Sequence, residues 1–217
     1  MSGHDHDHGH PHDADAHAPI EEGGGPVTWD EVLEAALREL CIEKGVFSGT
    51  QVMQALESMD ARRPEDGARL VARFWTEPDF RRLALENGRA AAETGGIDMT
   101  GAPDLVFLEN TPQVHHVVVC TLCSCYPKAV LGIPPAWYKS KAYRARVVRE
   151  PRAVLKEFGT VLPKSVDVRV ADSTAELRFL VVPLRPAGTE GLSLEQLAAL
   201  VTRDSMVGVT QALSPSP

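Results

Sequence analysis

The chain has 217 residues and a formal net charge of −8, with 43% hydrophobic and 24% charged residues. This length suits one globular domain with appendages or two small domains, and the composition is ordinary for a protein with a buried core. The negative charge argues against a nucleic-acid-binding function, which needs a basic surface. No apolar run reaches the roughly 18–20 residues of a membrane span, and no signal peptide is visible. We therefore expect a cytoplasmic protein with no membrane contact.

The first 26 residues (MSGHDHDHGHPHDADAHAPIEEGGGP) contain six of the eight histidines and neither lysine nor arginine. Such a polar segment buries too little apolar surface to offset its ordering entropy, so we expect residues 1–26 to be disordered. Its alternating His and Asp residues form either a loose, exchangeable metal-binding tail or an inert acidic tail.

Residues 27–96 are predicted to form a helical arm. Thr28 and Glu31 have the spacing of a capping box, and the apolar residues that follow keep a helical period until Gly45. The helices expected after it cover residues 50–59, residues 64–75, and a fourth stretch that is capped by Thr76 and runs to about Gly95. Two interpretations remain open, because these helices could pack on another protein or form a bundle of their own.

Residues 97–210 change to mixed strands and helices, and residues 211–217 are expected to be a flexible C-terminus. Alternating or continuous apolar runs predict strands over 105–108, 114–120, 166–171, 177–184 and 206–209, and helices over 134–149, 151–158 and 194–203. A helix-rich first part followed by mixed elements indicates an α+β protein with an N-terminal helical arm.

Three of the four cysteines lie within six residues of one another, in the segment VVVCTLCSCYP (117–127). Cys120, Cys123 and Cys125 follow a β-branched run and precede Pro127, so a buried strand should lead into a tight loop that carries three thiols. Thiolates bind soft metals or act as nucleophiles, and an intracellular protein has little use for a disulfide framework. This loop is therefore the candidate functional site.

Four interpretations of the loop compete. A structural zinc site needs four ligands, and only His115 or His116 lies near enough in sequence to add one. A redox C-x-x-C motif normally opens a helix, and a single reactive thiol leaves the other two unexplained. The fourth is a non-zinc transition metal held by three sulfurs and the main-chain nitrogens of Ser124 and Cys125, with a sixth position open. Such strong-field donors suit a trivalent low-spin ion.

The segment HHVVVCTLCSCYP (115–127) resembles the metal-binding motif of the nitrile hydratase α subunit and of the related thiocyanate hydrolase γ subunit. The similarity continues through LGIPPAWYKSKAYRARVVREPRAVLKEFGT (131–160), VRVADSTAELRFLVVPLRPAGTEG (168–191) and LVTRDSMVGV (200–209). About 170 residues are covered. The resemblance implies a metal domain with a layered α-β-β-α arrangement.

The resemblance also implies the ligands and the metal. Cys120, Cys123 and Cys125 would supply the sulfurs, with Cys123 as a sulfinic and Cys125 as a sulfenic acid. Main-chain nitrogens of Ser124 and Cys125 would complete the set. Thr121 in C-T-L-C is similar to the cobalt branch of the family, which implies Co(III) with Fe(III) as the alternative.

Oxygenated sulfurs need hydrogen-bond donors, which in the family are arginines of a partner β subunit, so the resemblance implies a hetero-oligomer whose partner the helical arm would wrap. Glu176 and Arg178 align with residues that orient the metal loop and tune its charge. An exposed cross-strand ion pair between them is the alternative explanation.

Lys128 departs from the pattern, since nitrile hydratases usually carry Trp there and thiocyanate hydrolases Arg. An aromatic wall suits an uncharged nitrile, whereas a cation suits the thiocyanate anion. Our hypothesis is the metal-bearing catalytic subunit of a cobalt nitrile hydratase, in which Cys125, Ser124, Glu176 and Arg178 serve the hydration of a nitrile to an amide. The alternatives are thiocyanate hydrolysis to carbonyl sulfide and ammonia, and a non-enzymatic cobalt-carrying maturation protein.

Overall fold

The strands of the computed structural model form two parallel pairs. β1 (Asp104–Glu109) pairs with β4 (Leu177–Val182), and β2 (Val114–Val119) pairs with β3 (Asp167–Asp172). These four strands lie where the alternation of the sequence predicted them, to within two residues at each end. The structure describes residues 27–123 and 125–215, so the predicted tail of residues 1–26 lies outside it.

The helices occupy the remaining regular segments of the described chain. Their bounds are α1 Trp29–Glu43, α2 Gly49–Asp60, α3 Pro64–Thr76, α4 Pro78–Glu86, α5 Gly88–Thr94, α6 Lys128–Leu131, α7 Ala136–Lys139, α8 Lys141–Arg146, α9 Pro151–Glu157, α10 Leu194–Ala198 and α11 Arg203–Val207. None of these helices combines the length and apolar character that crossing a bilayer requires.

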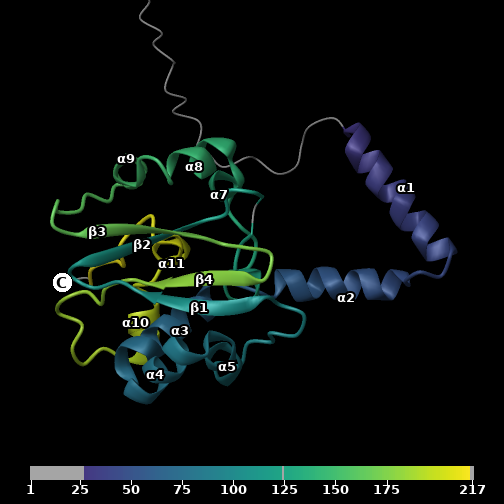
Figure 1. The fold of residues 1–217 in the computed structure, drawn as a ribbon. Helices are drawn as coiled ribbons and strands as arrows, with labels where there is room; N and C mark the ends of the chain where they lie inside the picture. The colour runs from purple at the N-terminus through teal and green to yellow at the C-terminus, as the bar shows by residue number, and fades with distance from the viewer. Residues whose placement is uncertain (1–26, 124, 216–217) are drawn as a thin grey trace, which may run out of the picture.

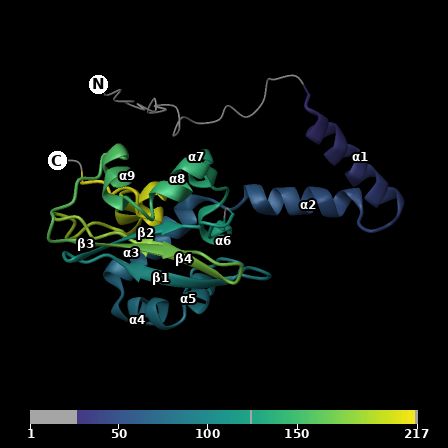
Figure 2. The same cartoon turned by 45° about the horizontal axis from the view of Figure 1, so that its top comes forward.

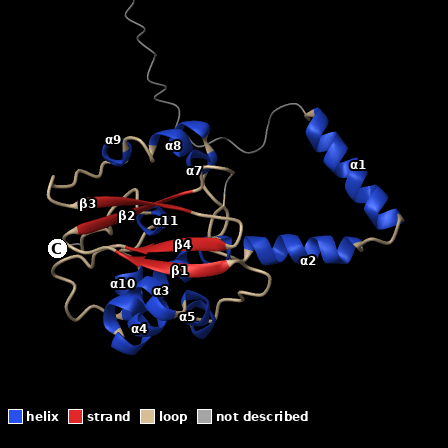
Figure 3. Cartoon of the chain, in the orientation of Figure 1, coloured by secondary structure: helices blue, strands red, loops and turns tan. Residues whose placement is uncertain are grey.

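Helices enclose the strands from two sides. α4 and α5 pack on β1, with α3 and α10 beside them, whereas α9 contacts β3 and continues the layer of α7 and α8 (Figures 1 and 3). α11 lies inside, against β2, β4 and α3. The predicted mixed α/β architecture is thus confirmed.

One hydrophobic core joins these layers. The run Val117–Val119 at the end of β2 is at most 1% exposed, and Leu180–Val182 of β4 is equally inaccessible. Because strands buried on both faces read as continuous apolar runs, both segments could be recognised from sequence. The core fixes the end of β2, from which the cysteine loop starts.

The first two helices contribute nothing to this core. α1 and α2 bury no side chain and project away from the body of the protein (Figure 2). The predicted capping box of α1 is confirmed, since Glu31 N–H donates to Thr28 Oγ1 at 3.3 Å and Thr28 N–H to Glu31 Oε2 at 2.7 Å. The large apolar side chains that these two helices and their connection leave exposed are Trp29, Val32, Leu33, Leu37, Leu40, Ile42, Val46, Met53, Leu56 and Met59. Within the expected arm of residues 27–96, α3–α5 instead belong to the core.

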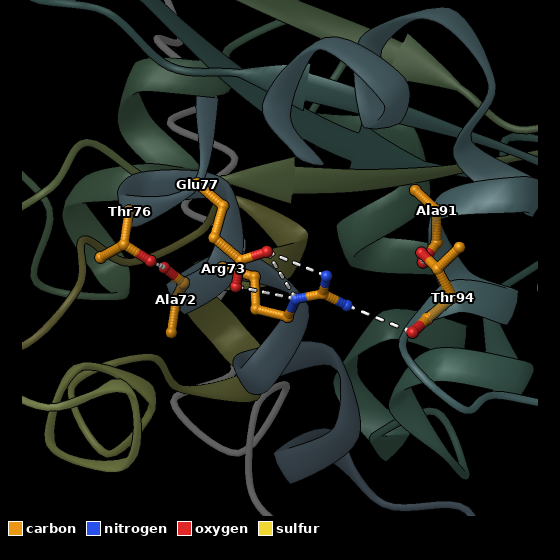
Figure 4. Close-up of polar contacts among 6 residues, drawn as sticks. All are labelled: Ala72, Arg73, Thr76, Glu77, Ala91 and Thr94. Carbon is orange, nitrogen blue, oxygen red and sulfur yellow. Dashed lines mark hydrogen bonds and ion pairs between the residues drawn. The ribbon is translucent and has the colours of Figure 1, made fainter. Parts of the chain in front are cut away.

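Arg73 ties α3 to the helices that follow it. Its guanidinium donates to both carboxylate oxygens of Glu77 at 2.9–3.1 Å and to the carbonyl of Thr94 at 3.3 Å, as Figure 4 shows. The same guanidinium lies 4.1 Å from the ring centre of Phe80. A bidentate, half-buried ion pair of this kind holds the α3–α4 junction against α5.

The predicted fourth helix differs from the structure in two respects. Thr76 ends α3, where its hydroxyl donates to Ala72 O at 2.9 Å, and Glu77 is the N-cap of α4. The helix is then interrupted at Asn87, so that α5 begins separately at Gly88. A Cβ atom at Gly88 would lie 2.1 Å from the carbonyl oxygen of Leu105. This approach of α5 to β1 is a tertiary constraint that helical periodicity cannot show.

The predicted strand over 206–209 is wrong. Met206 and Val207 belong to α11, which starts at the N-cap Thr202 with a capping box to Ser205 and ends at Gly208. The helix predicted over 194–203 is correspondingly shorter and ends at Ala198. A short apolar run fits a buried helix as well as a strand, so periodicity alone could not decide.

Gly208 gives the first prediction. It has φ +91°, and an added Cβ would lie 2.0 Å from the carbonyl oxygen of His116, whereas Gly96 has φ +85° with nothing within 4 Å. Left-handed backbone costs a non-glycine residue about 1–2 kcal/mol. We expect Gly208→Ala to lower the free energy of unfolding, measured in urea by circular dichroism, clearly more than Gly96→Ala. Equal losses for the two variants would contradict the close approach of α11 to β2.

Candidate metal centre

The cysteine loop starts where β2 ends. Val119 is the last residue of β2 and lies opposite Asp172, the last residue of β3, in the parallel register. Cys120 follows directly and is 1% exposed. The end of a buried strand therefore fixes the first thiol, and the next two extend from it toward the surface, since Cys125 is half-buried and Cys123 exposed.

The three sulfur atoms converge. Cys120 Sγ lies 3.4 Å from Cys123 Sγ, which lies 3.2 Å from Cys125 Sγ, and one atom from each residue falls within 4.8 Å of the others. These separations exceed the roughly 2.05 Å of a disulfide, so the thiols are not bonded to one another. Neighbouring sulfurs at these distances subtend about 90° at an ion with metal–sulfur bonds of about 2.3 Å.

This angle bears on the type of metal. Sulfurs around a tetrahedral zinc ion would lie about 3.8 Å apart, given bonds of about 2.3 Å. The observed 3.2–3.4 Å suits the right angles of an octahedral or square-based site better. The clustered soft sulfurs therefore fit the transition-metal interpretation.

The histidines that could have completed a zinc site are engaged elsewhere. His115 is buried, with Nε2 2.7 Å from Gly208 O and Nδ1 3.2 Å from the amide nitrogen of Asn110. His116 Nδ1 lies 3.2 Å from Asn110 Oδ1, and the His116 main-chain N–H donates to the same oxygen at 2.7 Å. Among the described residues, the clustered ligand groups at this site are the three cysteines alone.

The protonation of Cys125 depends on its surroundings. Burial, followed by hydrogen bonds with Cys123 and Cys120, raises the pKa of the Cys125 thiol to about 12, while the positive charge of Arg178 acts in the opposite direction. A metal binds the thiolate, so binding at neutral pH must displace this proton. Cys125 is thus a neutral thiol until an ion arrives.

A carboxylate from β3 holds the beginning of the loop. Asp172 accepts the Thr121 hydroxyl at 2.6 Å and the Thr121 main-chain N–H at 3.0 Å. Sequence reasoning did not select Asp172, because 51 residues separate the two partners. The available signal was an acid at the end of an alternating strand, which is common in exposed turns and carries no indication of its partner.

Aromatic residues hold the other end of the loop. The Tyr138 hydroxyl donates to the carbonyl of Cys125 at 2.7 Å, and its ring meets Tyr126 edge to face at 5.0 Å. Trp137, Tyr143 and Phe158 extend this cluster. Because Tyr138 is completely buried, the main chain at Cys125 is fixed from inside the protein.

Of the other predicted site residues that the structure describes, only Arg178 is brought to the sulfur cluster. Arg178 lines the same cavity as Cys123 and Cys125, and its guanidinium donates to the carbonyls of Thr174 and Leu177. Glu176 is exposed, and no ion pair joins it to Arg178 in the described part of the chain. Ser124 lies outside the described residues.

A cavity of about 540 Å³ opens beside the sulfurs. Its walls come from the loop itself, from the segment of residues 99–103 before β1, and from Lys128, Arg178 and Arg62. Pockets of this size bind small organic molecules. A substrate in this cavity would meet the exposed side of the sulfur cluster.

Comparison with known proteins agrees with this geometry. A family model described as "Nitrile hydratase, alpha chain" matches residues 29–210. The chain belongs to the nitrile hydratase α-chain family. It is 49% identical over 179 residues to the cobalt-containing nitrile hydratase subunit alpha of Pseudonocardia thermophila, covering 82% of this chain and 88% of that one.

Two further relatives widen the comparison. Identity is 45% over 190 residues with the thiocyanate hydrolase subunit gamma of Thiobacillus thioparus, covering 82% of this chain and 78% of that one. A solved double mutant of the Fe-type nitrile hydratase from Comamonas testosteroni Ni1 matches with a TM-score of 0.80 and 44% identity, covering 87% of this chain and 94% of that one. The predicted resemblance to the nitrile hydratase α chain is confirmed. The relatives include cobalt-containing and Fe-type proteins, and nitrile hydratases as well as a thiocyanate hydrolase, so they do not single out one metal or one activity.

The Asp172 contact gives the second prediction. Asp172→Asn leaves Thr121 one good acceptor in place of two, and a hydrogen bond to a charged group contributes about 1.5–3 kcal/mol. We expect the variant to retain less cobalt per chain, measured by elemental analysis after gel filtration. Asp167→Asn is the control, because that exposed residue of β3 contacts Arg169 and not the loop. Full cobalt content in Asp172→Asn would contradict the positioning role.

Proposed function

We propose that this chain is the metal-bearing subunit of a hetero-oligomeric nitrile hydratase, which adds water to the C≡N bond of a small nitrile to give an amide. The observation that carries the proposal is the convergence of the Cys120, Cys123 and Cys125 sulfurs at separations suited to right angles on one ion. The cobalt-containing relative supports Co(III) as the metal, and the Fe-type relative keeps Fe(III) as the alternative.

The ion would supply Lewis acidity toward the cyano group or the attacking water. The residues of the chain hold and tune it: three thiolates and the main-chain nitrogens of Ser124 and Cys125 serve as ligands. The contacts of Asp172 and Tyr138 fix the two ends of the loop. Arg178 places a positive charge beside Cys125 and stabilises its anionic form.

The exposure of the sulfurs supports unequal oxidation. Oxidation of a thiolate requires access, and Cys120 is buried whereas Cys123 is exposed and Cys125 half-buried. We propose that Cys123 and Cys125 carry the sulfinic and sulfenic groups. Their anionic oxygens need donors, which arginines of a β-type partner subunit would supply. Glu176 remains a predicted orienting residue, placed on the exposed turn before β4.

The exposed arm formed by α1 and α2 supports the proposal of a partner subunit. α1 and α2 carry a continuous set of exposed apolar side chains and no core of their own. A groove between the two helices is lined by Leu33, Leu37, Cys41, Phe47 and Val52. Contiguous exposed apolar surface of this kind marks a protein–protein interface. We propose that the arm packs on the β-type subunit.

Thiocyanate hydrolysis is the second candidate. Lys128 lines the cavity three residues after Cys125, and a cation there suits an anionic substrate. The non-enzymatic alternative, a cobalt-carrying maturation protein, would transfer its metal readily to another chain. Slow exchange of bound cobalt, measured with a radioactive isotope, would exclude that role.

Replacement of one central ligand tests the proposed function. Cys123→Ala removes the sulfur that lies within 3.4 Å of both others, so we expect loss of cobalt retention and of activity. Elemental analysis and assays with a neutral nitrile and with thiocyanate are the measurements. Cys41→Ala, on the arm and outside the sulfur cluster, should retain cobalt. Cobalt at full stoichiometry in Cys123→Ala would refute the metal site.

The arm can be tested separately. The double substitution Leu33→Ser/Leu37→Ser makes the groove polar, so we expect less β-type subunit to co-purify with the tagged chain. The thermal transition of the isolated chain should not change, because both residues lie outside the core. Glu39→Gln, on an exposed position of the same helix, is the control. Unchanged partner recovery in the double variant would contradict the docking role.

A further inference from the structure

Away from the cysteines, the charged side chains that line the cavity beside the loop are all basic, in a negatively charged protein. Arg62, Lys128 and Arg178 line it, and no Asp or Glu occurs among the described residues of its walls. The chain as a whole carries a formal charge of −8. Charges of one sign around a cleft concentrate ligands of the opposite sign, so the cavity favours anions.

Arg62 is the member of this set that neither the sequence motif nor the metal site explains. It lies between α2 and α3, where its carbonyl oxygen would be 2.4 Å from a Cβ added to Gly132. That close approach fixes the main chain of Arg62 next to α6. The half-buried side chain has no carboxylate within ion-pair distance in the described part of the chain.

Asp98 does not neutralise Arg62 through an ion pair. Asp98 lies with Arg62 along an adjoining cavity, and its carboxylate accepts the Thr100 main-chain N–H at 2.8 Å. The hydrogen bonds of Thr100 lower the pKa of Asp98, and Arg62 adds a smaller electrostatic contribution. The Asp98 carboxylate thus pairs with Thr100 and forms no ion pair with Arg62, whose guanidinium can bind another anion.

The size of the cavity indicates what that anion is attached to. A volume of about 540 Å³ exceeds what a cyano group needs and leaves room for a carbon chain and a second polar group. Guanidinium groups bind carboxylates through two parallel hydrogen bonds, whereas a lysine acts as a point charge. Arg62 and Lys128 can therefore hold a carboxylate, while the cyano group faces Cys123 and Cys125.

We propose that Arg62 is a specificity-determining residue, which with Lys128 selects a cyano compound that carries a negative charge, a carboxylate-bearing nitrile in the first instance. The proposal rests on the proposed function, because it assigns the substrate class of the same site. It adds that the charged end of the substrate binds at the junction of α2 and α3. Thiocyanate shares the anionic cyano chemistry, and the experiment separates the two.

The test compares Arg62→Gln with Arg63→Gln in the cobalt-loaded hetero-oligomer. Arg63 is exposed, is the N-cap of α3 and does not line the cavity, so its change controls for lost charge. The substrates are 3-cyanopropionate, uncharged butyronitrile and thiocyanate. We expect Arg62→Gln to lower the ratio of kcat/KM for 3-cyanopropionate to that for butyronitrile by on the order of 10-fold to 100-fold. Arg63→Gln should leave the ratio unchanged.

Two further measurements complete the test. Arg62→Lys keeps the charge without the planar fork, and an intermediate ratio supports carboxylate binding. Calorimetric titration of 3-cyanopropionate into the metal-free hetero-oligomer reports binding without turnover, and Arg62→Gln should weaken it. An equal loss on thiocyanate assigns the site to inorganic as well as organic anions and supports the role of Arg62.

The measurements distinguish failure of the proposed function from failure of the anion site at Arg62. If the cobalt-loaded complex converts none of the three compounds, the proposed function fails, and the calorimetric binding still decides whether Arg62 forms an anion site. If butyronitrile is hydrated but Arg62→Gln changes neither the kcat/KM ratio nor the binding of 3-cyanopropionate, the anion site is overturned while the proposed function stands.

Discussion

The parallel pairing of β2 with β3 is the constraint on which the candidate site depends. It places Val119 opposite Asp172. The cysteine loop therefore begins at the end of β2 directly beside the carboxylate at the end of β3. Two hydrogen bonds from Thr121 to that carboxylate then set the direction of the loop. A slip of one residue in the register would turn Asp172 to the opposite face of its strand. The three cysteines would then lie on a loop that no longer has the Thr121–Asp172 hydrogen bonds to position it.

The sequence predicted the elements whose evidence is local. The buried valines before Cys120, the alternation of β3 and the capping box of α1 each depend on residues a few positions apart, and each prediction agrees with the structure. The cysteine cluster could be recognised in the same way, because all three thiols lie on one short loop. The distances between the sulfurs, which spacing alone does not give, add a reason to prefer right angles over tetrahedral angles at a bound ion.

The features that were missed depend on contacts between distant segments. Asp172 contacts the loop from β3, and Arg62 lines the adjoining cavity from the connection between α2 and α3; neither position carries a recognisable pattern. The break between α4 and α5 is likewise set by a distant group, the carbonyl of Leu105. The helical form of Met206 and Val207 is the exception, because its cap at Thr202 is local and the short apolar run fitted a helix and a strand equally well.

The exposed arm has a consequence for assembly. Isolated helices of the length of α1 and α2 are marginally stable in water, and these two have no buried residues to stabilise them. If the arm packs on a β-type subunit as proposed, its order draws on the free energy of association, and folding of the arm and binding of the partner become one equilibrium. Dilution would unfold the arm while the β-sheet body stays intact. Chains made in excess of their partner would then expose an apolar, protease-sensitive segment. Degradation of these chains would match the number of subunits to the number of partners.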